Sequence, residues 1–114
     1  MPTTPINESQ LMTGLWAELP VPTDATTSRT VVNNDAMRIV EFAMDSGQEL
    51  TDHASDRAVA VLMQVGEMTF TVAGVPHDLV PGDVVYLAPG ERHALVARSA
   101  CRFTLVLTRV GATA

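Results

Sequence analysis

Histidines are the side chains best suited to chemistry in this 114-residue sequence, which holds one cysteine and no lysine. Without a lysine the chain cannot form a Schiff base, so pyridoxal-type and lysine-aldolase reactions are excluded. Imidazole serves as a general base, a hydrogen-bonding group or a metal ligand near neutral pH. Two histidines, His53 and His93, lie in glycine-framed segments. The third, His77, follows Gly74-Val75-Pro76 and is expected on the surface beside a hairpin.

Polar residues cluster around His53 in the sequence. Asp52 or Asp56 could support His53 as a general base, although carboxylates next to a turn are equally suited to solvent. If the chain is extended here, His53, Ser55 and Arg57 share a face and point inward together. An inward Arg57 would clamp a carboxylate or phosphate, whereas at the rim it would pair with Asp52 or Asp56. Ser55 has a second interpretation, as a cap of the loop.

The overall charge excludes several kinds of partner. Thirteen acidic residues outnumber seven basic ones, for a net charge of −6, and a nucleic-acid binder normally carries a basic face. The longest uncharged apolar run, Ala58–Val65, is too short to span a membrane. Cys101 is alone, which excludes an intrachain disulfide and favours a reducing compartment. No secretory signal is visible at the start. We therefore expect a cytoplasmic protein with a small-molecule partner.

The elements that must position these residues are short strands within one domain. Apolar residues alternate in Glu67–Val72, which predicts a sheet with one buried side, and Gly74 is placed at a hairpin tip. About eight such runs without intervening helices predict an all-β closed barrel or jelly roll. The predicted strands are Arg29–Asn33, Met37–Met44, Arg57–Val65, Glu67–Ala73, Val75–Val80, Asp83–Leu87, His93–Arg98 and Cys101–Val110.

Residues 1–28 read as an N-terminal extension, partly helical, ahead of a β domain at residues 29–114. Leu11, Leu15 and Trp16 fall at helical spacing after Asn7, a candidate N-cap residue. These apolar side chains suit a plug or a dimer contact better than a binding site. We therefore expect a homodimer built through barrel strands and the N-terminal segment.

Two segments of the sequence resemble the motifs of the cupin family, and the resemblance spans about Met37–Val110. The first family motif runs glycine, five residues, histidine, one residue, histidine, three or four residues, glutamate, six residues, glycine. Gly47, His53 and Gly66 match it. The second motif runs glycine, five residues, proline, one residue, glycine, two residues, histidine, with asparagine four positions on. Gly82, Gly90 and His93 match, while the proline is displaced to Pro89 and Ala97 replaces the asparagine.

The resemblance implies an RmlC-like jelly-roll barrel with a site inside its mouth. In this arrangement His53 and His93 would face each other across the interior, with apolar walls around a few polar groups. The expected ligand pocket comprises His53, Ser55, Arg57 and His93. The family also commonly pairs its barrels, which agrees with the expected homodimer.

The resemblance further implies a divalent metal site held by three imidazoles and a carboxylate. Carried over to this chain, His53 and His93 are the ligands, while Ser55 replaces the second histidine and Val59 replaces the glutamate. A hydroxyl is a poor ligand and valine is none, so Ni, Cu, Zn, Fe or Mn would be bound weakly.

Three functions are consistent with these residues. A binding module would hold a small organic molecule, acidic or neutral, with weak metal or none. A metal-dependent cupin enzyme (an oxygenase, isomerase or decarboxylase) would use His53 and His93. A non-metal epimerase would need a histidine base backed by a carboxylate, which only His53 with Asp52 or Asp56 supplies. The substitutions at Ser55 and Val59 favour the binding module, because one barrel hosts many chemistries and its site decides among them.

Overall fold

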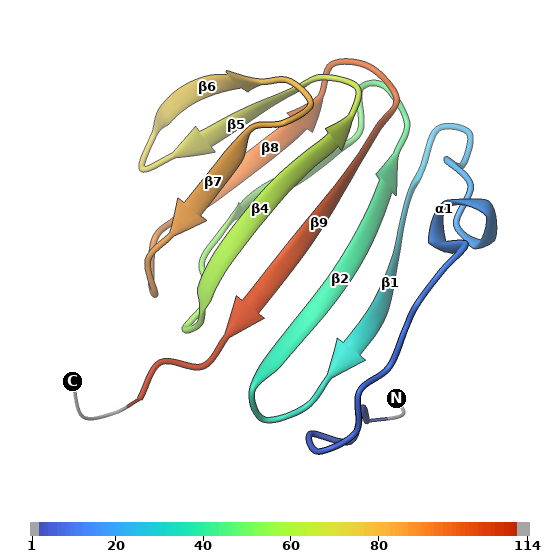
Figure 1. Ribbon diagram of the computed structural model, residues 1–114. Helices are drawn as coiled ribbons and strands as arrows, with labels where there is room; N and C mark the ends of the chain where they lie inside the picture. Colours follow the sequence, from blue (N-terminus) through green and yellow to red (C-terminus); the bar gives the residue numbers. More distant parts are fainter. Residues whose placement is uncertain (1–2, 112–114) are drawn as a thin grey trace.

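Nine strands form two antiparallel sheets in the computed structural model, which describes residues 3–111 (Figure 1). One sheet has the order β1-β2-β9-β4-β7 and the other the order β3-β8-β5-β6. Together they make the all-β jelly roll that the sequence predicts. The strands are β1 (Thr26–Asn33), β2 (Met37–Met44), β3 (Glu49–His53), β4 (Ala58–Val65), β5 (Met68–Val72), β6 (Val75–Leu79), β7 (Val84–Leu87), β8 (His93–Ala97) and β9 (Cys101–Thr108).

Each of the eight predicted strands is present, with ends that differ by a few residues, but β3 was not predicted. Leu50 is the only apolar residue of Glu49–His53, so no alternation of apolar side chains marks this strand. It pairs with β8 alone, at one edge of the four-stranded sheet. At the other end of the domain, β1 begins at Thr26, ahead of the boundary expected at residue 29.

The core lies between the inner faces of the two sheets. Met68 and Phe70 of β5 are almost fully buried, as the alternation in this strand predicts, and Phe103 of β9 meets them from the opposite sheet. The Phe103 ring stacks on Phe42 of β2, with centroids 4.8 Å apart. Burial of an aromatic side chain of this size contributes about 1.5–3 kcal/mol, so these rings stabilise the two-sheet packing.

Two glycines allow turns that other residues would strain. Ala73 and Gly74 both have positive φ angles, 48° and 81°, which gives the type I′ geometry preferred in two-residue hairpins. Gly74 therefore occupies the predicted hairpin tip. Gly66, between β4 and β5, has φ 78°, and a Cβ atom there would lie 2.2 Å from the carbonyl oxygen of Ala100. Only glycine fits at position 66, where the turn passes close to the backbone of Ala100.

The N-terminal extension contains a single helical turn, α1 (Leu15–Glu18). Its N-cap is Gly14, so the prediction of a helix starting at Asn7 is wrong. So short a helix needs tertiary contacts, and these come from Arg102 of β9. The Arg102 guanidinium donates to the carbonyls of Trp16 and Leu19 and lies 5.4 Å from the centroid of the Trp16 ring. Within residues 3–111 no helix has the length and apolar character needed to cross a membrane.

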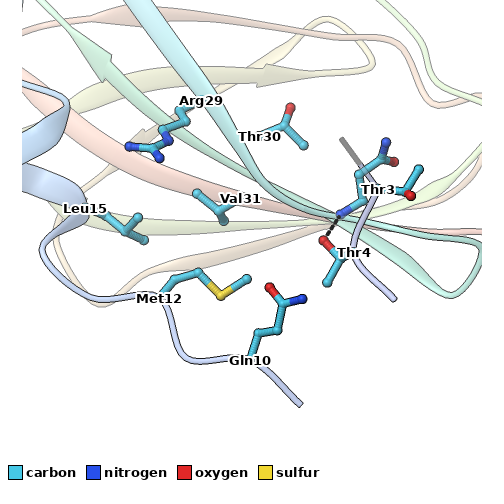
Figure 2. Close-up of a pocket in the computed structure, with 9 residues that line it drawn as sticks. Thr3, Thr4, Gln10, Met12, Leu15, Arg29, Thr30 and Val31 are labelled. Atoms are coloured by element: carbon cyan, nitrogen blue, oxygen red, sulfur yellow. Dashed lines mark hydrogen bonds between the residues drawn. The ribbon is translucent and has the colours of Figure 1, made fainter. Parts of the chain in front are cut away.

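A hollow of about 250 Å³ lies between the extension and the outer edge of β1 (Figure 2). The backbone N–H of Thr4 donates to the Asn33 carbonyl, and the Asn33 N–H donates to Thr4 Oγ1, which ties the start of the described chain to β1. The walls of the hollow are mostly threonine, methionine, leucine and amide side chains, and no histidine or carboxylate lines it among the described residues. The hollow is outside the barrel and separate from the residues predicted to act.

Candidate functional site

His53 and His93 lie next to each other at one end of the four-stranded sheet. His53 ends β3, His93 begins β8, and the two residues are cross-strand partners. Their ring centroids are 4.2 Å apart, with the ring planes at 59°. The sequence predicts rings that face each other across the interior. They instead lie side by side on one sheet, because the unpredicted strand β3 pairs directly with β8.

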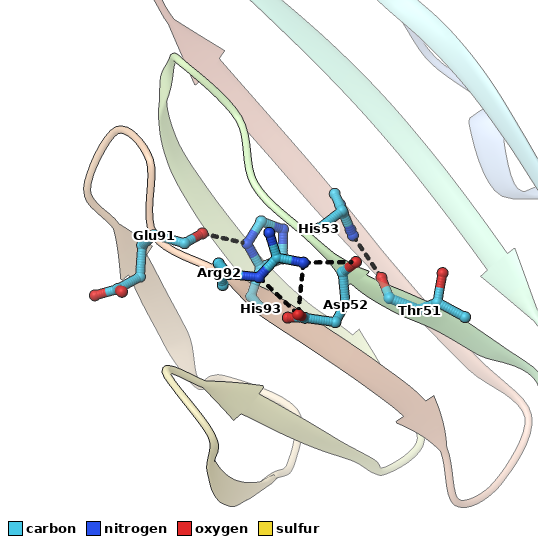
Figure 3. Close-up of polar contacts among 6 residues, drawn as sticks. All are labelled: Thr51, Asp52, His53, Glu91, Arg92 and His93. Atoms are coloured by element: carbon cyan, nitrogen blue, oxygen red, sulfur yellow. Dashed lines mark hydrogen bonds and ion pairs between the residues drawn. The ribbon is translucent and has the colours of Figure 1, made fainter.

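Both imidazoles are fixed by backbone carbonyls (Figure 3). His53 Nδ1 lies 2.8 Å from the carbonyl oxygen of Thr51, and His93 Nδ1 lies 3.0 Å from that of Glu91. A carbonyl oxygen only accepts, so each Nδ1 carries the proton and donates it. In the neutral rings both Nε2 atoms therefore keep a lone pair, which suits them to accept a ligand proton or to bind a metal.

A small cavity opens beside the two rings. Its volume is about 60 Å³, several times the roughly 10–15 Å³ that one water molecule requires. His93 is 8% exposed and stacks on Phe70, with centroids 5.8 Å apart, whereas His53 is exposed at the mouth. The lining is apolar except for three side chains, and it consists of Leu50, His53, Ser55, Val59, Val61, Phe70, Leu87, His93, Leu95, Leu105 and Leu107.

An ion pair joins the two histidine segments on the outside. Arg92 Nε lies 2.7 Å from Asp52 Oδ2, and its Nη2 reaches the Asp52 carbonyl at 3.4 Å (Figure 3). Both side chains are more than half exposed, so the pair contributes little to stability. The Asp52 carboxylate is therefore bound by Arg92 and not by His53. Because the Nδ1–H of His53 donates to a carbonyl, the His–carboxylate base needed by an epimerase is not formed.

Ser55 and Arg57 lie in the turn between β3 and β4, so the extended run that would point both inward does not exist. Ser55 lines the cavity, and its Oγ accepts the main-chain N–H of Arg57 at 3.1 Å, the loop-capping role considered above. Its carbonyl accepts from Gly90 N–H at 2.7 Å. Arg57 does not line the cavity and pairs with neither Asp52 nor Asp56. It borders a separate hollow with Asp56 and Arg109.

The remaining candidates lie away from the cavity. His77 is exposed on β6, as predicted. Cys101 is fully buried at the start of β9, and burial raises the pKa of its thiol to about 11. A thiol with such a pKa is protonated at neutral pH, which agrees with a structural role and not with a nucleophile.

The donor set beside the cavity does not suit a tightly held metal ion. Two imidazoles are available, but Ser55 Oγ already accepts a backbone N–H, and Val59 presents a buried aliphatic side chain. No cluster of three or more His, Cys, Asp or Glu side chains able to hold a metal occurs in the described part of the chain. A divalent cation between two neutral imidazoles would lack an anionic ligand.

Comparison with known proteins places this barrel in a family. The sequence model of one protein family, described as the cupin domain, matches residues 40–107, which is more than half of the chain. The protein belongs to the cupin family, as its motifs suggest. No curated protein matches the sequence.

Solved structures show the same fold. A conserved protein of unknown function from Streptococcus pyogenes is 27% identical, with a TM-score of 0.82 over 98% of each chain. A cupin superfamily protein from Desulfitobacterium hafniense is 17% identical, with a TM-score of 0.80 over 90% of this chain and 94% of that one. A predicted oxalate decarboxylase from Thermotoga maritima is 17% identical, with a TM-score of 0.69 over 75% of this chain and 81% of that one.

Sequence reasoning missed the apolar half of the site. Phe70, Leu50 and Leu95 wall the cavity, and none of the three is among the residues that the sequence predicts for the site. The alternation in β5 places Phe70 on the buried face, but it does not tell which buried residues border empty space. The carbonyls of Thr51 and Glu91 carry no side-chain pattern at all, and they follow from the backbone path.

Proposed function

We propose that this cupin barrel is a binding module for a small organic molecule, acidic or neutral, which enters the cavity beside His53 and His93. The observation that carries the proposal is the pair of oriented imidazoles at the mouth of an apolar cavity that offers no third metal donor. A few polar groups on an apolar wall is the usual composition of a small-ligand site. The Nε2 atoms would accept hydrogen bonds from the ligand, and the walls would hold its apolar part.

The metal has a minor place in this proposal. Nickel, copper or zinc would bind the two imidazoles weakly, and manganese or iron more weakly still, because affinity follows the Irving–Williams order. Ser55 and Val59 give such a metal ion neither a charged ligand nor a free ligating atom.

The alternative is a metal-dependent cupin enzyme that uses His53 and His93 as its protein ligands. The orientation of both rings through Nδ1 favours it, since metal-binding histidines commonly donate their other N–H to a carbonyl. Among the similar structures, the Thermotoga maritima protein is described as a predicted oxalate decarboxylase. An enzyme of this kind would require the metal to remain bound through turnover.

A titration followed by NMR tests the binding proposal with two matched probes, pentanoate and its neutral analogue pentanamide. We expect at least one of them to shift the ring resonances of His53 and His93 and to leave those of His77 unchanged. Because His77 lies on β6 outside the cavity, it reports non-specific effects. If neither probe shifts His53 or His93 at millimolar concentration, the proposal is contradicted.

We also propose that the protein assembles as a homodimer. Val84 and Tyr86 of β7 are 61% and 67% exposed, and their register partners on β4 are Leu62 and Ala60. All four are uncharged, so two copies of a chain with a net charge of −6 would meet there without direct repulsion. Trp16, 48% exposed in α1, offers a second apolar contact.

A further inference from the structure

Two rows of cavity-lining side chains each lead to an arginine. Val59 on β4 and Leu107 on β9 are cross-strand partners, and both line the cavity. Arg57 comes one residue before β4 begins at Ala58, and Arg109 comes one residue after β9 ends at Thr108. Because Ala58 and Thr108 are cross-strand partners, the two arginines lie at the same end of the sheet, close in the chain to Val59 and Leu107.

These arginines border a common hollow. Its volume is about 370 Å³, and Asp56, Arg57, Arg109 and Val110 line it. The start of β4 and the end of β9 lie side by side (Figure 1). His53 ends β3 and Ser55 lies in the loop that leads from β3 to β4, so the hollow is at the end of the barrel where these two residues lie. Ser55 links the two spaces, because it lines the cavity and its Oγ accepts the main-chain N–H of Arg57.

No carboxylate among residues 3–111 pairs with either guanidinium. Arg29, Arg92 and Arg98 pair with Glu18, Asp52 and Asp78. For Arg57 and Arg109, in contrast, the described residues provide no side-chain hydrogen bond and no ion pair, and Nη1 of Arg57 is buried without an acceptor. A buried cationic donor is costly unless an acceptor satisfies it.

Asp56 is the one carboxylate on the wall of this hollow, and it pairs with neither arginine. It would repel an incoming anion while the two guanidinium groups attract it. The local balance is one positive charge in a chain with a net charge of −6. This positive balance favours anionic ligands over cationic ones.

We infer that Arg57 and Arg109 bind the carboxylate of a small organic anion whose short apolar part occupies the cavity beside His53 and His93. This inference rests on the proposed binding function and specifies its ligand class. Guanidinium groups hold carboxylates through charge-assisted, often paired hydrogen bonds. The apolar lining and the volume of about 60 Å³ leave space for an apolar part of a few carbon atoms.

The test compares pentanoate with pentanamide at low ionic strength, by NMR titration of the wild-type protein and of two variants, Arg57→Gln and Arg109→Gln. We expect pentanoate to bind at least about tenfold more tightly than pentanamide, as the loss of a charged hydrogen bond implies. Either substitution should remove most of that preference and leave the affinity for pentanamide within twofold. Added salt should weaken pentanoate binding alone.

Two controls make the test specific. Arg98→Gln removes an exposed arginine on another part of the barrel and should leave the preference for pentanoate unchanged. Asp56→Asn removes the opposing carboxylate and should tighten pentanoate binding, which a purely structural role of these residues would not produce. Arg109 is exposed, so its substitution leaves the fold intact even if that of Arg57 does not.

The possible failures are distinguishable. Equal binding of pentanoate and pentanamide at the cavity, unaffected by either arginine substitution, would overturn the inference and leave the binding module standing. The absence of any shift at His53 or His93 with both probes would overturn the binding module as well. If inorganic phosphate reproduces the shifts around Arg57 and Arg109 while pentanoate leaves the cavity unaffected, the arginines bind anions independently of the cavity, and the inference is again overturned.

Discussion

The imidazoles of His53 and His93 lie with their centroids 4.2 Å apart because the two residues are cross-strand partners on β3 and β8. Their spacing is a property of the sheet register, and each ring is oriented by a carbonyl two residues before it in the chain. The backbone therefore sets the positions of both rings. Substitutions at neighbouring cavity positions can add donors to it.

Protein dialysed against a mild chelator is expected to carry well under one metal ion per chain. The absence of one imidazole and of the carboxylate should lower the metal affinity by more than the roughly 10–100-fold attributed to the loss of outer-sphere partners. The double substitution Ser55→His with Val59→Glu rebuilds the family's ligand set and should restore tight binding. Elemental analysis and isothermal titration with nickel, zinc and manganese measure both effects.

The single substitution Ser55→His is the matched control for this metal experiment. It adds an imidazole without the anionic ligand, so its affinity should fall between those of the wild type and the double variant. Stoichiometric metal in the chelator-treated wild type would contradict the prediction and favour the enzyme. A folded double variant that binds no metal would mean that positions 55 and 59 do not correspond to the family's ligands.

Replacing His93 should affect ligand binding more than folding. His93→Asn keeps a side-chain N–H for the Glu91 carbonyl but removes Nε2 and the stacking on Phe70. The stacking accounts for about 0.5–1.5 kcal/mol, so the melting temperature should fall by several degrees. Pentanamide affinity should fall by about fivefold or more, the amount that one hydrogen bond from its amide N–H to Nε2 provides. His77→Ala, on exposed β6, should change neither value; unchanged binding in His93→Asn would exclude His93 from the site.

Light scattering at micromolar concentration should give the mass of a dimer. Tyr86→Glu with Val84→Glu would place charges on the proposed interface and should yield monomers, since like charges would then meet across a symmetric contact. Val75→Glu is the control, because Val75 is 55% exposed on β6 of the other sheet. A clean monomer mass near 12.2 kDa for the wild type would refute the dimer.

Gly66→Ala should destabilise the protein by more than about 3 kcal/mol. A left-handed conformation costs a non-glycine residue roughly 1–2 kcal/mol, and here the new Cβ would also lie 2.2 Å from the Ala100 carbonyl oxygen. Gly47→Ala is a matched control, because Gly47 has φ 83° and nothing within 4 Å of its Cβ position. Its cost should stay near 1–2 kcal/mol. Urea unfolding measures the free energy of unfolding of both variants. Equal losses of stability would show that the contact with Ala100 is unimportant.

Cys101 should make the protein less stable at alkaline pH. Burial raises the pKa of the folded thiol from 9.0 to about 11, so between these values the unfolded chain releases a proton that the folded chain keeps. The free energy of unfolding then falls as the pH rises, by at most about 1.4 kcal/mol per pH unit. Urea midpoints from pH 8 to pH 10.5 should show this decline in the wild type. The Cys101→Ala variant should lack it, and identical slopes would contradict the prediction.

The strands and their buried faces could be predicted because alternation and turn chemistry are local. Met68 and Phe70 fall on the buried side of β5 by parity alone, and Gly66 and Gly74 occupy turns that require positive φ. These features depend on neighbours within a few residues, so one sequence contains the information for them. The position of His53 and His93 at one end of the barrel is instead implied by the resemblance of the glycine-framed segments to the cupin motifs.

Tertiary structure decided how the site is assembled. β3 has almost no apolar pattern, and it exists because β8 offers an unpaired edge, which sets the two imidazoles side by side. The turn at Ser55 places Arg57 on the hollow that it shares with Arg109, fifty-two positions along the chain, at the same end of the barrel as the cavity. Neither result follows from local propensity. Strand pairing and the approach of distant side chains depend on which surfaces remain available after the two sheets have packed together.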